Sequence, residues 1–133
     1  MWQEEAKLLR SVPGVGSIVT ATLIARLPEL STLNRKEVAD LVGVAPFNRD
    51  SDTLRGKRTL WGGREPLRTA LYMATLVATR HNPILRDFYQ RLCVPGKPKK
   101  VALTACLRKL LVILNSMVKY HRAWTTVGQP LDI

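Results

Sequence analysis

Apolar residues recur at intervals of three and four positions along most of the chain, a pattern typical of helices with one buried face. The pattern predicts helices over residues 3–10, 18–27, 35–42, 66–80, 83–92 and 100–120. The last segment is apolar on almost all sides, so we expect it to be mostly buried. Apart from Lys109 and Ser116, its polar positions form one narrow stripe, consisting of Thr104, Arg108, Asn115 and Lys119. The predicted inner face of the second helix consists of Ile18, Ala21, Ile24 and Ala25.

The predicted helices begin at residues that suit helix starts. Ser17 can cap the second helix, and Asn34 with Glu37 forms a capping box at the start of the third. Pro66 fits a first helical position, and Asn82-Pro83 starts a further helix. Residues 44–65 show no helical period, so we expect an irregular insert or a short β-hairpin there. With aromatic residues at only 6%, the sequence predicts an all-α domain.

The charge of the chain is strongly positive and unevenly distributed. The 133 residues include 21 Lys and Arg against 10 Asp and Glu, a net charge of +11. Residues 1–66 hold 10 basic and 8 acidic side chains, whereas residues 67–133 hold 11 basic and 2 acidic ones. A chain of this length forms one domain, and a surplus of this size favours a polyanionic partner, first of all nucleic acid.

Several other classes of protein are disfavoured. The longest uncharged apolar stretches are about half of a membrane span, and no secretory signal is visible, so no membrane partner is expected. Cys93 and Cys106 are isolated and only two histidines are present, so we predict no metal site and a reduced, cytoplasmic protein.

The segment Leu8–Ser17 contains a Pro-Gly-Val-Gly turn between two helices and resembles a helix-hairpin-helix, here over about residues 3–27. Glycines allow a phosphate to approach the backbone closely, and the amides at the start of the second helix attract an anion. The predicted DNA-binding residues of this turn are Gly14, Val15, Gly16 and Ser17. A tight turn between two packed helices is the alternative interpretation.

A second group of basic residues surrounds Gly62-Gly63. The predicted phosphate clamp consists of Arg55, Lys57, Arg58, Arg64 and Arg68. Arginine can hold two phosphate oxygens at once, and only Glu65 counters these five charges. A solvated basic loop is the alternative.

Ser51 lies between Asp50 and Asp52. Chemistry alone favours an ordinary turn there, because aspartate and serine side chains bond to nearby amides. A nucleophilic serine would need a lost proton and a neutralised phosphate, and the neighbouring arginines could supply the second condition. A metal site at the two aspartates would lack a third ligand.

Several motifs together are similar to the C-terminal transposase domain of the DEDD insertion-sequence recombinases, which include bridge-RNA recombinases and relatives of the pilin-gene invertase. The matching segments are Ser11–Gly16, Leu41–Ser51, Arg55–Arg58, Trp61–Arg64, Ala78–Pro83 and Gly96–Cys106. The resemblance covers about residues 8–120. It implies that Ser51 is the catalytic nucleophile, which forms a covalent phosphoserine link with DNA.

The resemblance also implies an N-terminal RNase-H-like domain whose four acidic residues bind Mg²⁺. We expect that domain to be absent from this chain, so that the Mg²⁺ site lies elsewhere and the chain alone does not recombine DNA. The expected organisation is a transposase domain over residues 1–122, with a catalytic-serine loop at 44–65 and a helical part at 66–120, followed by an irregular tail over 123–133. Asp52 departs from the family, which usually has glycine after the serine.

The expected partner is DNA. A guide (bridge) RNA and a homo-oligomeric full-length protein in a prokaryotic cytoplasm also follow from the resemblance. Two other functions fit the residues: a non-catalytic helix-hairpin-helix module of a repair or recombination protein, and a structural RNA-binding protein.

Overall fold

The computed structural model describes residues 2–43 and 65–125 of the chain. Six helices occupy these ranges: α1 (Trp2–Arg10), α2 (Ser17–Arg26), α3 (Arg35–Gly43), α5 (Glu65–His81), α6 (Pro83–Cys93) and α7 (Lys99–Tyr120). No strand occurs in the described residues, so the all-α prediction is confirmed. The insert predicted near residues 44–65 lies outside these ranges except for residue 65.

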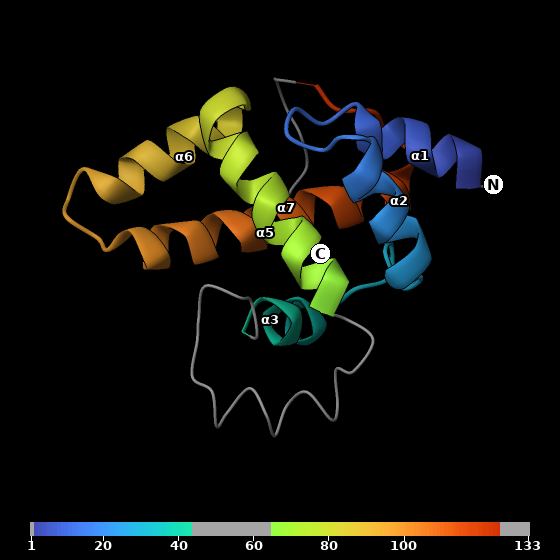
Figure 1. Ribbon diagram of the computed structural model, residues 1–133, viewed down its shortest axis with the longest axis horizontal. Coiled ribbons are helices and arrows are strands. Elements are labelled where there is room, and N and C mark those ends of the chain that lie inside the picture. Colours follow the sequence, from blue (N-terminus) through green and yellow to red (C-terminus); the bar gives the residue numbers. More distant parts are fainter. Residues whose placement is uncertain (1, 44–64, 126–133) are drawn as a thin grey trace.

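The last helix, α7, is the centre of the fold. It contacts α1, α3, α5 and α6, while α2 packs against α1 and α5. In Figure 1, α7 (orange to red) runs across the middle of the view, with α6 on the left and α1 and α2 on the right. The first and last thirds of the chain therefore share one core.

The burial of α7 follows from its composition. The side chains of Leu107, Leu110, Leu111, Ile113, Leu114 and Met117 are almost completely buried. Within the described residues, this is the one helix long and apolar enough to cross a membrane, and 61% of its most apolar stretch is buried inside the fold. A helix that is apolar all round suits the middle of a helical bundle, as the sequence predicted.

The predicted inner face of α2 is wrong. Ile18 is 83% exposed, and Ala21 and Ala25 are also exposed, while Thr20 and Leu23 are buried instead. Of the predicted face, Ile24 packs partly against the core. Because α2 is apolar on almost every side, periodicity alone cannot select the face that its neighbours cover.

The loop before α3 is fastened to α7 by one buried side chain. The Asn115 carboxamide oxygen accepts hydrogen bonds from the Ser31 amide at 2.8 Å and the Leu33 amide at 3.1 Å, and its nitrogen donates to the Leu33 carbonyl at 3.2 Å. These bonds hold Ser31 at a φ of +106°, which is unusual for a residue with a side chain. The polar stripe predicted on this helix is therefore buried at Asn115, where this side chain binds the loop before α3.

Candidate nucleic-acid interface

The turn between α1 and α2 is built on two valines that enter the core. Val12 and Val15 are both buried, and the Val15 amide donates a hydrogen bond to the Val12 carbonyl at 2.9 Å. The chain therefore reverses direction within a few residues, and α2 returns beside α1. The structure thus has a tight turn between two packed helices, and the assignment of this segment as a helix-hairpin-helix stays a prediction.

Gly14 lies where the turn approaches α5 most closely. Its φ is +108°, and a Cβ placed there would lie 2.9 Å from the Cβ of Ala78 and 3.1 Å from the backbone of Ala78. Both the left-handed backbone and the close approach require glycine. Part of the motif thus serves packing between the hairpin and α5.

Gly16 lies in a different environment two residues later. Gly16 is the N-cap residue of α2, with a φ of −94°, and no side-chain hydrogen bond caps the helix there. A Cβ at Gly16 would meet no atom within 4 Å. Ser17, predicted as the cap, is instead the first residue of α2. The amides of the first turn of α2 have no acceptor within their own helix, and no side chain caps them from Gly16.

The four predicted phosphate-binding residues therefore divide into two pairs. Gly14 is packed against α5, and the Val15 amide is already used inside the turn. Gly16 and Ser17 are exposed at the start of α2. Any phosphate bound here would contact the second pair and the amides that follow it.

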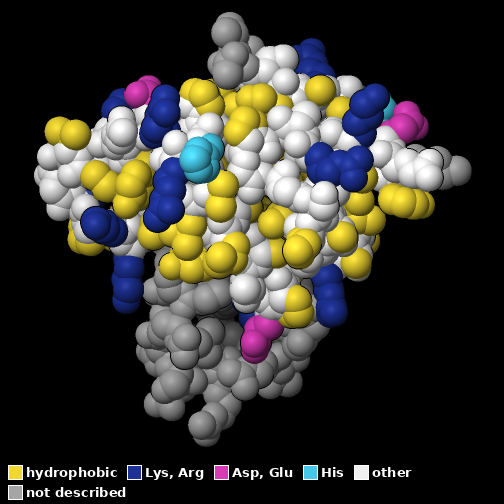
Figure 2. All heavy atoms as spheres, turned by 45° about the horizontal axis from the view of Figure 1, so that its top comes forward, with side chains coloured by type: hydrophobic (Ala, Val, Ile, Leu, Met, Phe, Trp, Pro, Cys, Tyr) yellow, Lys and Arg dark blue, Asp and Glu magenta, His cyan; other side chains and the backbone are white. Residues whose placement is uncertain are grey.

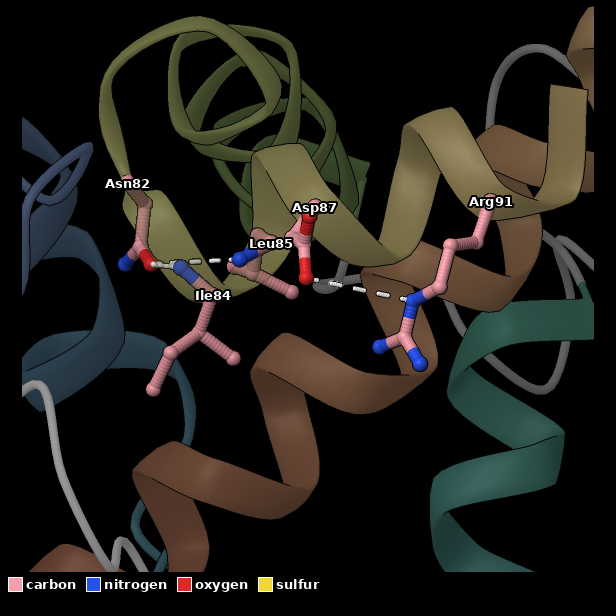
Figure 3. A network of polar contacts seen from close by, with 5 residues as sticks. All are labelled: Asn82, Ile84, Leu85, Asp87 and Arg91. Atoms are coloured by element: carbon pink, nitrogen blue, oxygen red, sulfur yellow. Dashed lines mark hydrogen bonds and ion pairs between the residues drawn. The ribbon is translucent and has the colours of Figure 1, made fainter. Parts of the chain in front are cut away.

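Asn82 fixes the position of the turn from the opposite side. Its side chain is fully buried, and its carboxamide nitrogen donates to the Pro13 carbonyl at 3.1 Å. Its oxygen accepts from the Ile84 and Leu85 amides at 3.1 and 3.3 Å, which caps α6 (Figure 3). The sequence predicted a helix start at Asn82-Pro83, but no local signal indicated the bond to Pro13.

An open hollow of about 520 Å³ lies beside the turn. Arg10 and the turn line one side, and Met73, Ala74 and Val77 of α5 line the other. The exposed Arg10 brings a positive charge to the hollow that Gly16 also lines. The sequence analysis did not single out Arg10, since one basic residue at a helix end is common.

The positive charge of the chain is visible on the surface. On the face drawn in Figure 2, Lys and Arg side chains (dark blue) lie on both sides, apolar side chains (yellow) lie between them, and acidic side chains (magenta) are few. This distribution creates a field that attracts a polyanion.

The predicted clamp and the predicted nucleophile lie mostly beyond the described residues. Ser51, Arg55, Lys57, Arg58 and Arg64 all fall within the range 44–64. Arg68 is on α5 and is only 5% exposed. A phosphate could reach its guanidinium only if the residues covering it moved.

Carboxylates and thiols form no metal centre in the described ranges. No group of three or more His, Cys, Asp and Glu side chains is close enough there to hold an ion. The four-carboxylate Mg²⁺ site that the resemblance implies therefore has no counterpart among these described residues.

Comparison with known proteins agrees with the motifs. The sequence model of the "Transposase IS116/IS110/IS902 family" matches residues 6–90. A pilin gene-inverting protein of Moraxella bovis is 31% identical over 121 residues, which cover 88% of this chain and 38% of that protein.

Two insertion-element proteins are similar over most of the chain as well. An uncharacterised 42 kDa protein of element IS900 from Mycobacterium paratuberculosis is 34% identical over 133 residues, covering 92% of this chain and 33% of that protein. A 44.8 kDa protein of element IS116 from Streptomyces clavuligerus is 28% identical over 125 residues, covering 92% and 31%. No solved structure matches the chain.

The chain thus spans about a third of the length of these curated relatives. The resemblance stated from the motifs is confirmed, because the match begins in α1, includes the hairpin and the Leu41–Ser51 segment, and continues into α6. On this match, which covers more than half of its residues, the chain belongs to the IS116/IS110/IS902 family of transposases.

Proposed function

We propose that this chain is the DNA-binding, serine-bearing part of a transposase or site-specific recombinase that moves an insertion sequence. Membership of the family supports the reaction class. The observation that carries the DNA-binding role is the hairpin: a turn locked by Gly14 and Asn82, followed by a helix whose first amides have no side-chain cap. The proposed location is the cytoplasm of a prokaryotic cell.

The proposed contact at the hairpin is with the DNA backbone. The amides at the start of α2 would donate hydrogen bonds to one phosphate, and Arg10 would contribute positive charge beside it. Such contacts fix the position of the duplex and carry no sequence information. Target choice would then depend on other groups, for which a guide RNA is the proposed source.

The proposed nucleophile is Ser51. Its hydroxyl would lose a proton, attack a DNA phosphorus and displace a deoxyribose oxygen, leaving a phosphoserine link. The relatives are about three times as long as the matched segment, so we propose that Mg²⁺ binding, assembly into a homo-oligomer and strand exchange need the rest of such a protein.

Replacing Ser51 by Ala in a full-length protein should abolish recombination and keep DNA binding. Unchanged recombination would instead favour a non-catalytic binding module.

Substitutions at Gly16 test the hairpin contact without disturbing the fold. A Cβ fits at this position, and aspartate is a preferred N-cap residue. Gly16→Asp should therefore keep or raise the thermal stability, yet weaken duplex binding at least tenfold, because a carboxylate would occupy the phosphate position.

Gly16→Ala is the matched control, since it adds a Cβ without a charge or a cap. It should bind duplex DNA as the original chain does. Equal binding by the Asp and Ala variants in a fluorescence anisotropy titration would contradict the hairpin contact. Stronger binding of a folded RNA than of duplex DNA would favour the structural RNA-binding alternative.

A further inference from the structure

A second hollow lies where the loop before α3 meets the C-terminal end of α7. These two segments are distant in the sequence. The hollow has a volume of about 630 Å³ and is lined by residues 31–36 and by Lys119. Asn115, one helical turn before Lys119, holds this loop through three hydrogen bonds. The wall of the hollow is therefore formed by two segments that are fixed to each other.

The charged residues that line this hollow are all positive. Arg35 and Lys36 come from α3 and Lys119 from the end of α7, and all three side chains are exposed. No carboxylate lines the hollow. In the described ranges none of these three cations forms an ion pair, and Lys119 contacts the Tyr120 ring at 5.3 Å.

The first turn of α3 is not itself the binding element. The Asn34 side chain accepts a hydrogen bond from the Glu37 amide at 2.8 Å, and the Asn34 amide donates to the Glu37 carboxylate at 3.0 Å. This reciprocal cap already occupies the start of the helix. The Glu37 carboxylate is thus engaged in this cap, and the attraction for an anion comes from the three side-chain cations.

Three cations that line one hollow attract an anion that binds among them, and the neighbouring Glu37 carboxylate offsets part of this attraction. The loop is held by Asn115 before any ligand arrives, which lowers the cost of ordering it. A phosphate group has the charge that suits a basic hollow, and an arginine can hold two of its oxygens at once.

We propose that this hollow, formed by residues 31–36 and Lys119, binds a backbone phosphate of duplex DNA, as a second contact in addition to the hairpin. The proposal rests on the proposed DNA-binding function and adds a site to it. Lys119 and Arg35 hold the phosphate, and Asn115 is a positioning residue that keeps the loop in place.

The test compares Lys119→Gln with Lys99→Gln in the complete chain. Both lysines are exposed and both belong to α7, at opposite ends that are about 30 Å apart at 1.5 Å per residue. The two variants lose the same charge from the same helix, so a general loss of positive field would affect them equally. Arg35→Gln, on the other wall, is a second variant of the site.

The readout is the dependence of the duplex dissociation constant on salt concentration, measured by fluorescence anisotropy. Losing one phosphate contact should lower the log–log slope by about 0.9 and weaken binding by up to about eightfold at 0.1 M salt. We expect this change for Lys119→Gln and for Arg35→Gln, and a slope within error of the original for Lys99→Gln. Circular dichroism checks that each variant is folded.

The outcomes separate this proposal from the proposed function. If the original chain binds no duplex, the DNA-binding function is wrong and the second contact with it. If it binds duplex and Gly16→Asp weakens binding, while Lys119→Gln behaves like Lys99→Gln, the hairpin contact stands and the basic hollow is overturned. If Lys119→Gln weakens binding of an RNA hairpin but leaves binding of duplex DNA unchanged, the DNA contact at this hollow is also overturned.

Discussion

Gly14 and Gly16 are two positions apart in one turn, and only the first requires glycine. Gly14 has a left-handed backbone and approaches Ala78 so closely that a methyl group would overlap it. Gly16 has an ordinary backbone and open space around it. The repeated glycines of the motif thus have separate causes, one in packing and one in exposure of the helix start.

At the scale of the residue, Gly14→Ala should lower the free energy of unfolding by about 2–4 kcal/mol, because backbone strain and overpacking add. Gly16→Ala should lower it by only about 0.5–1 kcal/mol, because alanine is a weaker N-cap than glycine but meets open space there. Urea unfolding measures both, and an unchanged m-value would show that the same two states are compared. Equal stabilities of the two variants would contradict the close approach to Ala78.

At the scale of the element, single polar side chains join segments that are distant in sequence. Asn82 caps α6 and also holds the carbonyl of Pro13, which is 69 positions away. Asn115 holds the loop before α3 from a position 82 to 84 residues later. Both side chains are buried, so their bonds are protected from competition with water.

The variant Asn82→Asp separates the two roles of this residue. A carboxylate can still accept from the two α6 amides, but it cannot donate to Pro13 and would place an oxygen against that carbonyl. We expect a loss of about 2–3 kcal/mol in the free energy of unfolding. Asn34→Asp is the matched control, since that cap is exposed and should change stability by less than about 0.5 kcal/mol. Equal effects of the two substitutions would contradict the role of the Pro13 bond.

The sequence was sufficient for features that depend on neighbours within a few residues. Helix periodicity, the Asn34–Glu37 capping box and the burial of α7 were all predicted correctly. The inner face of α2 was not, because an evenly apolar helix carries no local sign of which side is covered. The Asn82–Pro13 bond also depends on a long-range contact, which no spacing rule indicates.

The candidate site also combines features that local sequence indicates with features that depend on contacts between distant segments. The motif predicted a phosphate-binding turn, but it could not distinguish the inward pair, Gly14 and Val15, from the exposed pair, Gly16 and Ser17. The phosphate contact stays a prediction. The hollow at Lys119 depends on bringing residues 31–36 to the end of α7. Charge counting had placed the positive surplus later in the chain, whereas this hollow combines cations from both halves. Ser51 as nucleophile stays a prediction.

At the scale of the whole molecule, the core holds a thiol that ionises only at high pH. Burial and, to a smaller extent, nearby Cys93 raise the pKa of Cys106, while Lys109 partly offsets the rise, and the resulting pKa is about 11. The reference value is 9.0, so between these two pH values the folded chain keeps a proton that the unfolded chain releases. This contribution to stability is complete below pH 9 and is lost as pH rises toward about 11.

We therefore expect Cys106→Ala to weaken the dependence of stability on pH in this window. The thiol should account for a loss of at most about 3 kcal/mol in the free energy of unfolding, because each unit of pKa shift corresponds to about 1.4 kcal/mol. Urea unfolding of both proteins at intervals across this range measures the difference, and a constant packing cost of the substitution would shift the curve without changing its slope. Parallel curves for the two proteins would contradict the raised pKa.

The central position of α7 has a consequence for how the protein is made. Synthesis proceeds from the N-terminus, and at rates of about 5–20 residues per second the helix that fills the core is completed only after most of the chain has emerged. Until then, the leucines that line α1, α2, α3 and α5 have no central partner to cover them. The nascent chain therefore passes through a period of exposed apolar surface, in which chaperones can bind it, and a message truncated before residue 99 would yield a polypeptide unable to close its core.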